Sequence, residues 1–226
     1  LGQNMNKSLA IDTSTTHFTI ACENNGVFIE YSMDNCLDHA KDLFININDI
    51  LQKATLDIKS LDFITVGIGP GRFSGLRVAV SAVQAIAYTH NIKVITQSSL
   101  CSIAAVAINQ FSIEKIAVAT DAGNNKIFFG CYHQDEENII KPIVKDSLIG
   151  IKDFEFNQTE FYGVGNAWTK YSDHLQNDKI TVLDEAENVY PDAKTMIAYA
   201  KNRYLTEKPK KPFDIQPNYL IDKVTN

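Results

Sequence analysis

The sequence contains an internal repeat that spans its two halves. AIDTSTTHFTIAC, residues 10–22, aligns without gaps with ATDAGNNKIFFGC, residues 119–131. FITVGIG, residues 63–69, is similar to FYGVGNA, residues 161–167, in the same order within each half. Chance similarity between hydrophobic strands is the alternative, but ordered similarity at two places favours duplication. We therefore expect two related lobes with a cleft between them.

The first hundred residues predict three strands followed by alternating helices and strands. Three short segments rich in β-branched and aromatic residues, separated by turn residues, predict an antiparallel meander. The expected strands are 8–11, 17–23, 27–33, 63–68 and 93–96, and the expected helices are 39–55 (with Asp38 as N-cap), 74–89 and 100–109. Because 63–68 is a continuous apolar run, we expect it to be buried on both faces of a sheet.

This order of elements, present twice, predicts an α/β fold of two duplicated actin-like (RNase H-like, ASKHA) lobes. Each lobe is expected to be a mixed sheet with flanking helices. The expected boundaries are residues 1–110 for the N-terminal lobe and 111–226 for the C-terminal lobe. Met5 is a candidate native start, so residues 1–4 are left out of the fold prediction as a candidate expression remnant.

Composition indicates an ordinary globular protein without a broad basic surface. The 226 residues carry a formal net charge of -6 and the pI is about 5.3, so a general electrostatic attraction to nucleic acid is missing. No apolar run is long enough for a membrane span, and no signal-peptide core precedes the first strand. The cysteines show no CxxC spacing, which favours reduced, buried thiols in the cytoplasm. They are Cys22, Cys36, Cys101 and Cys131.

A glycine-rich stretch, GIGPGRFSGLRVAV, begins where the predicted buried strand ends. We call residues 67–72 the glycine loop. Backbone N–H groups at a helix start can bind phosphate, but the strict motifs do not match. The Gly-Lys pair of a P-loop is absent, and Arg72 stands where the third glycine of GxGxxG belongs. A nucleophile elbow around Ser74 fails too, since Arg72 and Leu76 replace its glycines.

Two aspartates, Asp12 and Asp121, each end the predicted first strand of a half. They begin the Asp12 turn (Asp12-Thr13-Ser14-Thr15) and the Asp121 turn (Asp121-Ala122-Gly123-Asn124). In an actin-like fold such turns surround nucleotide phosphates, but Ser14 replaces the glycine that permits close approach. Ordinary turns held by the aspartate side chain are the preferred interpretation. The alternative is a nucleotide site that comprises Asp12, Thr13, Ser14, Gly69, Gly71 and Arg72.

Metal and nucleophile chemistry find little support in the sequence. His39 is followed one helical turn later by Leu43 rather than by a second histidine, so no metal site is expected. Ser74 and the pair Ser98-Ser99 follow strands without an assignable histidine and acid, and we expect them to be helix caps.

Three cationic groups remain to be assigned. Arg72 ends the glycine loop and Arg77 follows it, and either could meet an anion, a partner carboxylate or solvent. The run KPKKP, residues 208–212, is expected to form an extended linker, with a tRNA contact as the alternative.

Four segments in this order closely resemble the TsaB (YeaZ) family: LAIDTST, GIGPGRFSGLRVAV, DAGNNKIFFG and PNYLIDKV. The loop is the most specific of them, with Arg72 for the usual serine of the family and Ser74 for the usual threonine. The resemblance spans nearly the whole chain. It implies a bacterial ASKHA protein that supports synthesis of N6-threonylcarbamoyladenosine (t6A) at position 37 of tRNAs that read ANN codons.

The resemblance implies partners rather than catalysis. TsaC would make threonylcarbamoyl-AMP from threonine, bicarbonate and ATP, and TsaD would transfer the group to tRNA. TsaD carries a metal-binding HxxxH, whose place here reads His39-Ala40-Lys41-Asp42-Leu43. TsaE, a small P-loop ATPase, would bind the pair. The chain is thus expected to have no cofactor of its own, with ATP or ADP and a divalent metal held by the partners, no membrane partner, and tRNA reached through the complex.

The family further implies that the helices 39–55 and 74–89 form a bundle with TsaD, or with a second copy when TsaD is absent. The first helix has apolar residues on more than one face, which a core-facing helix does not need. The candidate partner-binding residues are His39, Leu43, Phe44, Ile47, Leu51, Arg77, Val80 and Gln84.

The expected function is a non-catalytic cytoplasmic subunit that activates TsaD and helps to recruit TsaE. A nucleotide-binding ATPase or kinase on the same fold is the alternative. A peptidase is disfavoured, because neither a metal pair nor a catalytic triad can be assigned.

Overall fold

The computed structural model describes residues 5–35 and 39–220. Contacts divide the chain into two compact units: the first comprises the residues up to Ser99 together with Pro191–Asn218, and the second contains Leu100–Tyr190. This division differs from the expected boundary at residue 110. A segment near the C-terminus completes the first unit, because its helix packs on the first sheet.

Each unit contains a five-stranded mixed sheet, and the two sheets have the same strand order. The strands are β1 (Lys7–Asp12), β2 (Phe18–Asn24), β3 (Val27–Met33), β4 (Phe63–Gly67), β5 (Lys93–Gln97), β6 (Lys115–Gly123), β7 (Lys126–Gln134), β8 (Ile140–Gly150), β9 (Phe161–Val164) and β10 (Ile180–Val182). The orders are β3-β2-β1-β4-β5 and β8-β7-β6-β9-β10. In both sheets the first two pairs are antiparallel and the last two are parallel. This equivalence confirms the predicted duplication.

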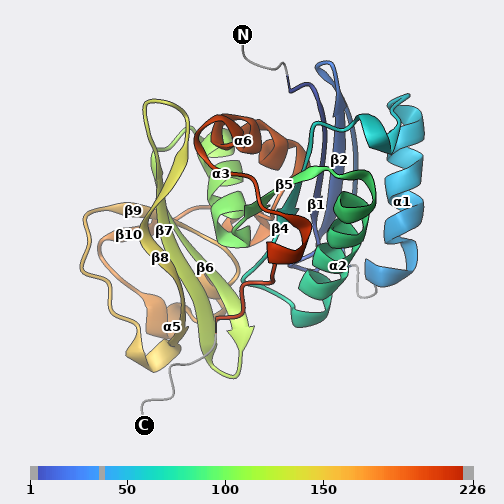
Figure 1. Ribbon diagram of the computed structural model, residues 1–226. Coiled ribbons are helices and arrows are strands. Elements are labelled where there is room, and N and C mark those ends of the chain that lie inside the picture. Colours follow the sequence, from blue (N-terminus) through green and yellow to red (C-terminus); the bar gives the residue numbers. More distant parts are fainter. Residues whose placement is uncertain (1–4, 36–38, 221–226) are drawn as a thin grey trace. The chain divides into compact units, whose positions relative to one another are not determined.

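Helices cover both faces of the first sheet (Figure 1). The α-helices are α1 (His39–Lys53), α2 (Phe73–His90), α3 (Ser99–Phe111), α4 (Ala167–Lys170), α5 (Ser172–Leu175) and α6 (Ala193–Thr206), and the short 3-10 turns include η1 (Ile58–Ser60) and η4 (Pro212–Asp214). Leu9 and Ile11 share a core with α1 and α2, whereas Ala10 packs against α6. Lys201 of α6 also pairs with the buried Glu23 of β2. β1 is therefore buried on both faces.

The core of the second unit is built around aromatic rings. Phe129 makes edge-to-face contacts with Phe154, Phe156 and Trp168, at centroid distances of 5.2, 6.0 and 6.3 Å. Trp168 is the only tryptophan of the chain, and its indole N–H donates to the Val164 backbone oxygen at 3.0 Å. The ring is buried, so its fluorescence reports on this unit alone.

The predicted elements of the first hundred residues agree with the structure to within one or two residues at their ends, but the predicted N-cap of the second helix does not. The second helix begins at Phe73 with Arg72 as its N-cap residue, which makes no side-chain cap. The prediction of Ser74 as a cap is therefore wrong, because Ser74 already lies inside the helix. The expected N-cap Asp38 lies outside the described residues. None of the helices in the described part of the chain is long and apolar enough to cross a bilayer.

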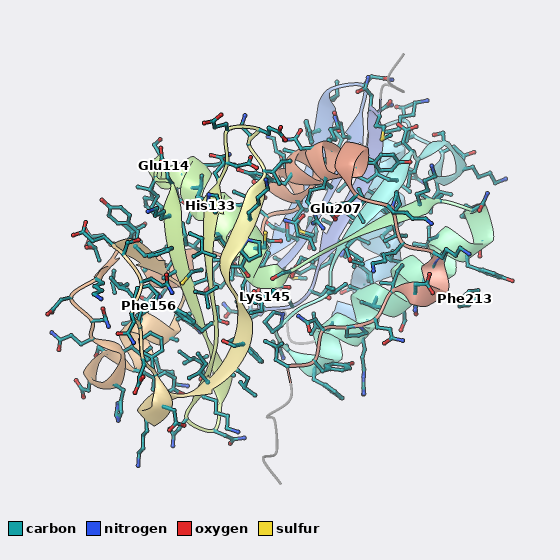
Figure 2. All side chains as sticks on the ribbon, turned by 60° about the vertical axis from the view of Figure 1, so that its left-hand side comes forward. Glu114, His133, Lys145, Phe156, Glu207 and Phe213 are labelled. Atoms are coloured by element: carbon teal, nitrogen blue, oxygen red, sulfur yellow. The ribbon has the colours of Figure 1, made fainter. Side chains whose placement is uncertain are left out.

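The predicted linker at 208–212 is instead part of an ordered segment, residues 208–218, which we call the C-terminal strap. The Lys210 N–H donates to the Val94 backbone oxygen at 2.8 Å, and these residues form an antiparallel bridge on the edge strand β5. Ile215 is buried in the core of the first unit. Figure 2 labels Glu207 and Phe213, which flank the lysines of the strap. The prediction of a linker is wrong, because sheet pairing and core burial hold the segment in place.

Candidate functional site

The glycine loop is filled by the chain's own Asp12 turn. A Cβ atom on Gly67 would lie 1.8 Å from Asp12 Oδ2, and one on Gly71 would lie 2.3 Å from the Ser14 backbone oxygen. The same oxygen accepts a hydrogen bond from the Arg72 N–H at 2.7 Å. The glycines therefore make room for protein atoms at the place where a phosphate-binding loop would leave room for phosphate.

Hydrogen bonds within the protein engage the side chains of the Asp12 turn. Asp12 Oδ1 accepts from the Ser14 N–H at 2.8 Å and from the Ser14 hydroxyl at 2.6 Å, and Oδ2 accepts from the Ser99 hydroxyl at 3.3 Å. Thr13 donates to the Gly75 backbone oxygen at 2.7 Å. Asp12, Thr13 and Ser14 are fully buried. Burial raises the pKa of Asp12, and the hydrogen bonds from Ser14 and Ser99 oppose this shift only in part.

Asp12→Asn is expected to stabilise the protein more at pH 7 than at pH 4. The pKa of Asp12 is raised above the unfolded value of 3.8, so the folded state binds this proton more tightly than the unfolded state. Stability should therefore fall as pH rises from about 4 through the folded pKa, and stay lower above it. Asparagine can accept both Ser14 hydrogen bonds without carrying a charge. Urea unfolding at the two pH values measures the effect, with the exposed Asp49→Asn as control; an equal change at both pH values would contradict it.

The glycine loop is also held from its other side, by residues that sequence reasoning missed. Ser99, the first residue of α3, accepts from the Gly69 N–H with its hydroxyl at 3.2 Å and donates its own N–H to the Gly69 oxygen at 2.9 Å. Asn218 of the C-terminal strap donates to the Ile68 oxygen at 2.7 Å. The loop is thus fixed by three segments that are distant in sequence. No local pattern marks such contacts.

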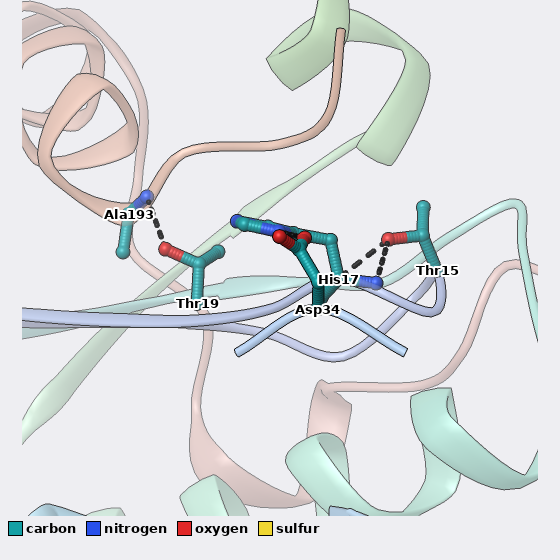
Figure 3. A network of polar contacts seen from close by, with 5 residues as sticks. All are labelled: Thr15, His17, Thr19, Asp34 and Ala193. Carbon is teal, nitrogen blue, oxygen red and sulfur yellow. Dashed lines mark hydrogen bonds and ion pairs between the residues drawn. The ribbon is translucent and has the colours of Figure 1, made fainter. Parts of the chain in front are cut away.

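A polar network continues the Asp12 turn into β2 and β3 (Figure 3). The Thr15 hydroxyl accepts from the His17 N–H at 3.0 Å, and the His17 ring contacts Asp34 at 2.6 Å between Nδ1 and Oδ1. The Thr19 hydroxyl accepts from the Ala193 N–H at the start of α6, at 3.1 Å. Hydrogen bonds therefore hold the segment between β1 and β2 to the neighbouring elements.

The Asp121 turn of the second unit is the tip of a β-hairpin. Asn124 and Asn125 have φ values of 52° and 56°, the left-handed pair that a two-residue type I′ turn requires. Asp121 Oδ1 accepts from the Gly123 N–H at 3.0 Å. Both aspartate turns therefore have the ordinary hydrogen bond that the preferred interpretation predicts.

The Asp121 carboxylate is also occupied by protein groups. Lys170 Nζ lies 2.5 Å from its Oδ2, and the Tyr171 hydroxyl donates to its Oδ1 at 2.8 Å. Partial burial opposes ionisation, but the hydrogen bonds from Lys170 and Tyr171 prevail and hold the pKa of Asp121 below its usual value. The residues of the nucleotide alternative therefore lie together in the first unit. There, Asp12 and Ser14 form hydrogen bonds within the protein.

The candidate partner-binding residues separate into buried and exposed sets. Leu43, Ile47, Leu51 and Val80 are buried in the core of the first unit. The prediction that these four residues lie on a partner surface is wrong, because their side chains pack in the core between the helices and the sheet. Gln84 donates through Nε2 to the Ile215 oxygen at 2.8 Å and so holds the C-terminal strap. The His39 side chain lies outside the described residues.

The exposed apolar residues of the two helices lie beside that core stripe. Phe44 and Ile45 of α1 have 58% and 59% of their surface exposed, and we call them the α1 surface. A pocket of about 350 Å³ adjoins Phe44 and is lined by α1, Leu56, Ile58 and Ile86. On α2 the Arg77 guanidinium lies 3.6 Å above the exposed Phe73 ring. The candidate partner-binding residues from the sequence include Phe44 and Arg77 but not Phe73.

In the part of the chain that the structure describes, no three His, Cys, Asp or Glu side chains group in a way that could hold a metal ion. The structure describes three of the cysteines, and Cys101 is partly exposed, which differs from the expected burial of the thiols. Cys22 and Cys131 are buried, and burial raises the pKa of both thiols to about 12. Such thiols are protonated and unreactive at neutral pH.

Comparison with known proteins agrees with this architecture. The sequence profile of the TsaD family, described as tRNA N6-adenosine threonylcarbamoyltransferase, matches residues 36–226. The chain is 26% identical to the tRNA threonylcarbamoyladenosine biosynthesis protein TsaB of Haemophilus influenzae, over 96% of this chain and 94% of the relative. It is 24% identical to the protein of that name from Escherichia coli, over 96% of this chain and 95% of the relative.

Solved structures share the fold. YeaZ from Pseudomonas aeruginosa superposes with a TM-score of 0.87 at 23% identity, covering 96% of this chain and all of that one. A second structure from that organism, described as similar to peptidase YEAZ, has a TM-score of 0.88 at 24% identity with the same coverage. The chain therefore belongs to the TsaD protein family and, within it, to the TsaB (YeaZ) group.

Proposed function

We propose that this chain is a non-catalytic subunit required to make t6A at position 37 of tRNA, and that it binds and activates the threonylcarbamoyltransferase TsaD. Relatives that match almost its whole length are named for the biosynthesis of tRNA threonylcarbamoyladenosine. The observation that carries the proposal is the glycine loop, which is filled by the fully buried Asp12 turn. Atoms of Asp12 and Ser14 occupy the space beside Gly67 and Gly71.

The residues of the first unit do not fit a nucleotide. The Asp12 carboxylate is engaged by Ser14 and Ser99, and the backbone beside the loop is engaged by Ser14 and Asn218. In this proposal ATP or ADP and a divalent metal belong to TsaD and to the ATPase TsaE, which docks on the joined pair. A role in tRNA modification implies that the chain works in the cytoplasm.

The α1 surface supports binding of a protein partner. Phe44 and Ile45 are adjacent, both more than half exposed, and Phe44 adjoins a pocket that could receive an apolar side chain. Burial of this surface would favour one conformation of TsaD over another. A difference of a few kcal/mol in binding is enough to shift most of a two-state population. Without TsaD, a second copy of the chain would cover the same surface.

Reconstitution tests the proposal. The purified chain is mixed with TsaD, TsaE, threonylcarbamoyl-AMP and an unmodified tRNA transcript, and t6A is measured by mass spectrometry of the nucleosides. Modification is expected to depend on this chain. Equal yield when the chain is omitted would overturn the proposal.

Phe44→Glu is expected to weaken the complex with TsaD by about 2 kcal/mol or more, which is about thirtyfold in Kd. A carboxylate at this position would have to be desolvated at the interface. Because Phe44 is exposed in the isolated chain, the substitution should leave its thermal stability nearly unchanged. Co-elution on size exclusion and titration by calorimetry measure the loss.

Val27→Glu is the matched control for this experiment. Val27 is an exposed apolar residue of the same unit, on β3 rather than on the helices. It should leave the affinity for TsaD unchanged. If Phe44→Glu and Val27→Glu bind equally well, the interface lies elsewhere.

A further inference from the structure

Four exposed lysines lie along one edge of the first sheet. β5 is the edge strand, and the C-terminal strap pairs with it in antiparallel direction through Val94 and Lys210. Lys93 directly precedes Val94 in β5, and Lys211 directly follows Lys210 in the strap. We call the exposed residues Lys93, Lys208, Lys210 and Lys211 the lysine edge. It concentrates positive charge in a chain whose formal net charge is -6.

Two acidic residues accompany the lysines within residues 207–218. Glu207, directly before the lysines, forms a two-point ion pair with Arg203, with distances of 2.9 and 2.7 Å. Its pKa is held below the usual value, first by Arg203 and to a smaller extent by Lys210. Asp214 follows in η4. Glu207 and Asp214 are thus the two carboxylates of residues 207–218, against three lysines there and Lys93 on β5, and Glu207 is paired with Arg203.

An exposed aromatic pair includes Phe213 of the strap, the segment that also carries three of the four lysines. Tyr88 of α2 and Phe213 of η4 are 65% and 70% exposed, and their ring centroids are 4.8 Å apart. Phe213, labelled in Figure 2, is only two residues from Lys211 in the sequence. Flat aromatic surfaces beside cationic side chains are the combination that binds unpaired bases and phosphates together.

The strap holds these groups in fixed positions. Ile215 is buried, its oxygen accepts from Gln84, and Asn218 is bonded to Ile68. Lysines on a sheet edge can also serve only to prevent pairing with another chain. Here the strap itself already covers the Val94 oxygen, and that protective role gives no reason to expose Tyr88 and Phe213.

We infer that the lysine edge, with Tyr88 and Phe213, binds RNA: the lysines contact the sugar-phosphate backbone and the ring pair stacks on an unpaired base. The inference rests on the proposed function, which supplies tRNA as the RNA. Few phosphates are contacted and the rest of the chain is acidic, so this surface adds to the affinity of the complex with TsaD rather than binding tightly by itself.

The test uses the complex of the full chain with TsaD and a fluorescently labelled, unmodified tRNA transcript. Binding is followed by anisotropy at several NaCl concentrations for a triple variant, Lys208→Gln, Lys210→Gln and Lys211→Gln. We expect about tenfold weaker binding at low salt, and a slope of log K against log salt that is smaller by about 2 to 3. Phe213→Ala should weaken binding without changing the slope.

Three controls separate charge from structure. Replacing the same three lysines by arginine should preserve binding, and the thermal midpoint of the glutamine variant should match that of wild type. The matched control removes three exposed lysines of the second unit, with Lys145→Gln, Lys152→Gln and Lys179→Gln. Its net charge equals that of the test variant, and its binding should stay close to wild type.

Equal affinity and equal salt slope in the test variant and wild type would overturn the inference. So would an equal loss in the matched control, since net charge would then explain the effect. If wild type stimulates modification while the test variant binds normally, only this inference fails. If wild type does not stimulate modification, the proposed function fails, and the binding curves still decide whether the lysine edge contacts RNA.

Discussion

Gly67→Ala is expected to destabilise the protein by about 3 kcal/mol. The new Cβ would lie 1.8 Å from Asp12 Oδ2, a separation that no pair of non-bonded atoms tolerates. Relief requires Asp12 to move, and movement breaks its hydrogen bonds with Ser14 and Ser99 inside a buried region. Chemical denaturation followed by circular dichroism measures the loss.

Gly26→Ala provides the comparison. Gly26 has a φ of +87° but an added Cβ would meet nothing within 4 Å, so only backbone strain of about 1 kcal/mol is expected. Removing the obstructing carboxylate should relieve the clash at Gly67. The double variant Asp12→Ala and Gly67→Ala is therefore expected to be more stable than the sum of the single changes predicts. If Gly67→Ala costs no more than Gly26→Ala, the Asp12 turn does not fill the loop.

Phe129→Ala should destabilise the second unit by about 3 to 5 kcal/mol. The ring packs edge-to-face on Phe154, Phe156 and Trp168, so its removal leaves a cavity and ends three aromatic contacts. Because Trp168 is the only tryptophan, its emission follows the unfolding of this unit in urea. Circular dichroism follows both units in the same titration.

Ile143→Ala is the control for the second unit. Ile143 is an exposed apolar residue on β8, and its truncation should change stability by no more than about 0.5 kcal/mol. A midpoint for Phe129→Ala that matches the control would mean that the aromatic cluster does not stabilise the unit. A shift seen by tryptophan emission but not by most of the dichroism signal would show that the two units unfold separately.

The strands and the first two helices could be predicted because local patterns specify them. The alternation in the meander and the apolar run at 63–68 depend only on neighbouring residues. α6 and the C-terminal strap could not be assigned to the first unit in this way. Their positions depend on contacts such as Lys201 with Glu23 and Asn218 with Ile68, which join residues that are far apart in the sequence.

The same limit applies to the candidate site. Glycine spacing located the loop, but it could not distinguish a loop that binds phosphate from one that is filled by protein atoms. In both cases the approaching atoms need the space that a Cβ would occupy. Helical periodicity found the apolar residues of α1. Periodicity could not show whether Leu43 or Phe44 faces outward, because both residues are apolar. Packing of the helix against the sheet buries Leu43 and leaves Phe44 exposed. The charges of residues 208–212 likewise did not indicate that Lys210 pairs with β5.

The discontinuity of the first unit bears on its biosynthesis. A ribosome completes β1 to β5 long before it makes α6 and the strap, so the nascent sheet has one apolar face without its helix. Ala10, Ala21 and Phe63 stay uncovered on that face until the residues after Pro191 have left the exit tunnel. The first unit therefore reaches its native contacts only after residues 100–190 of the second unit have been synthesised.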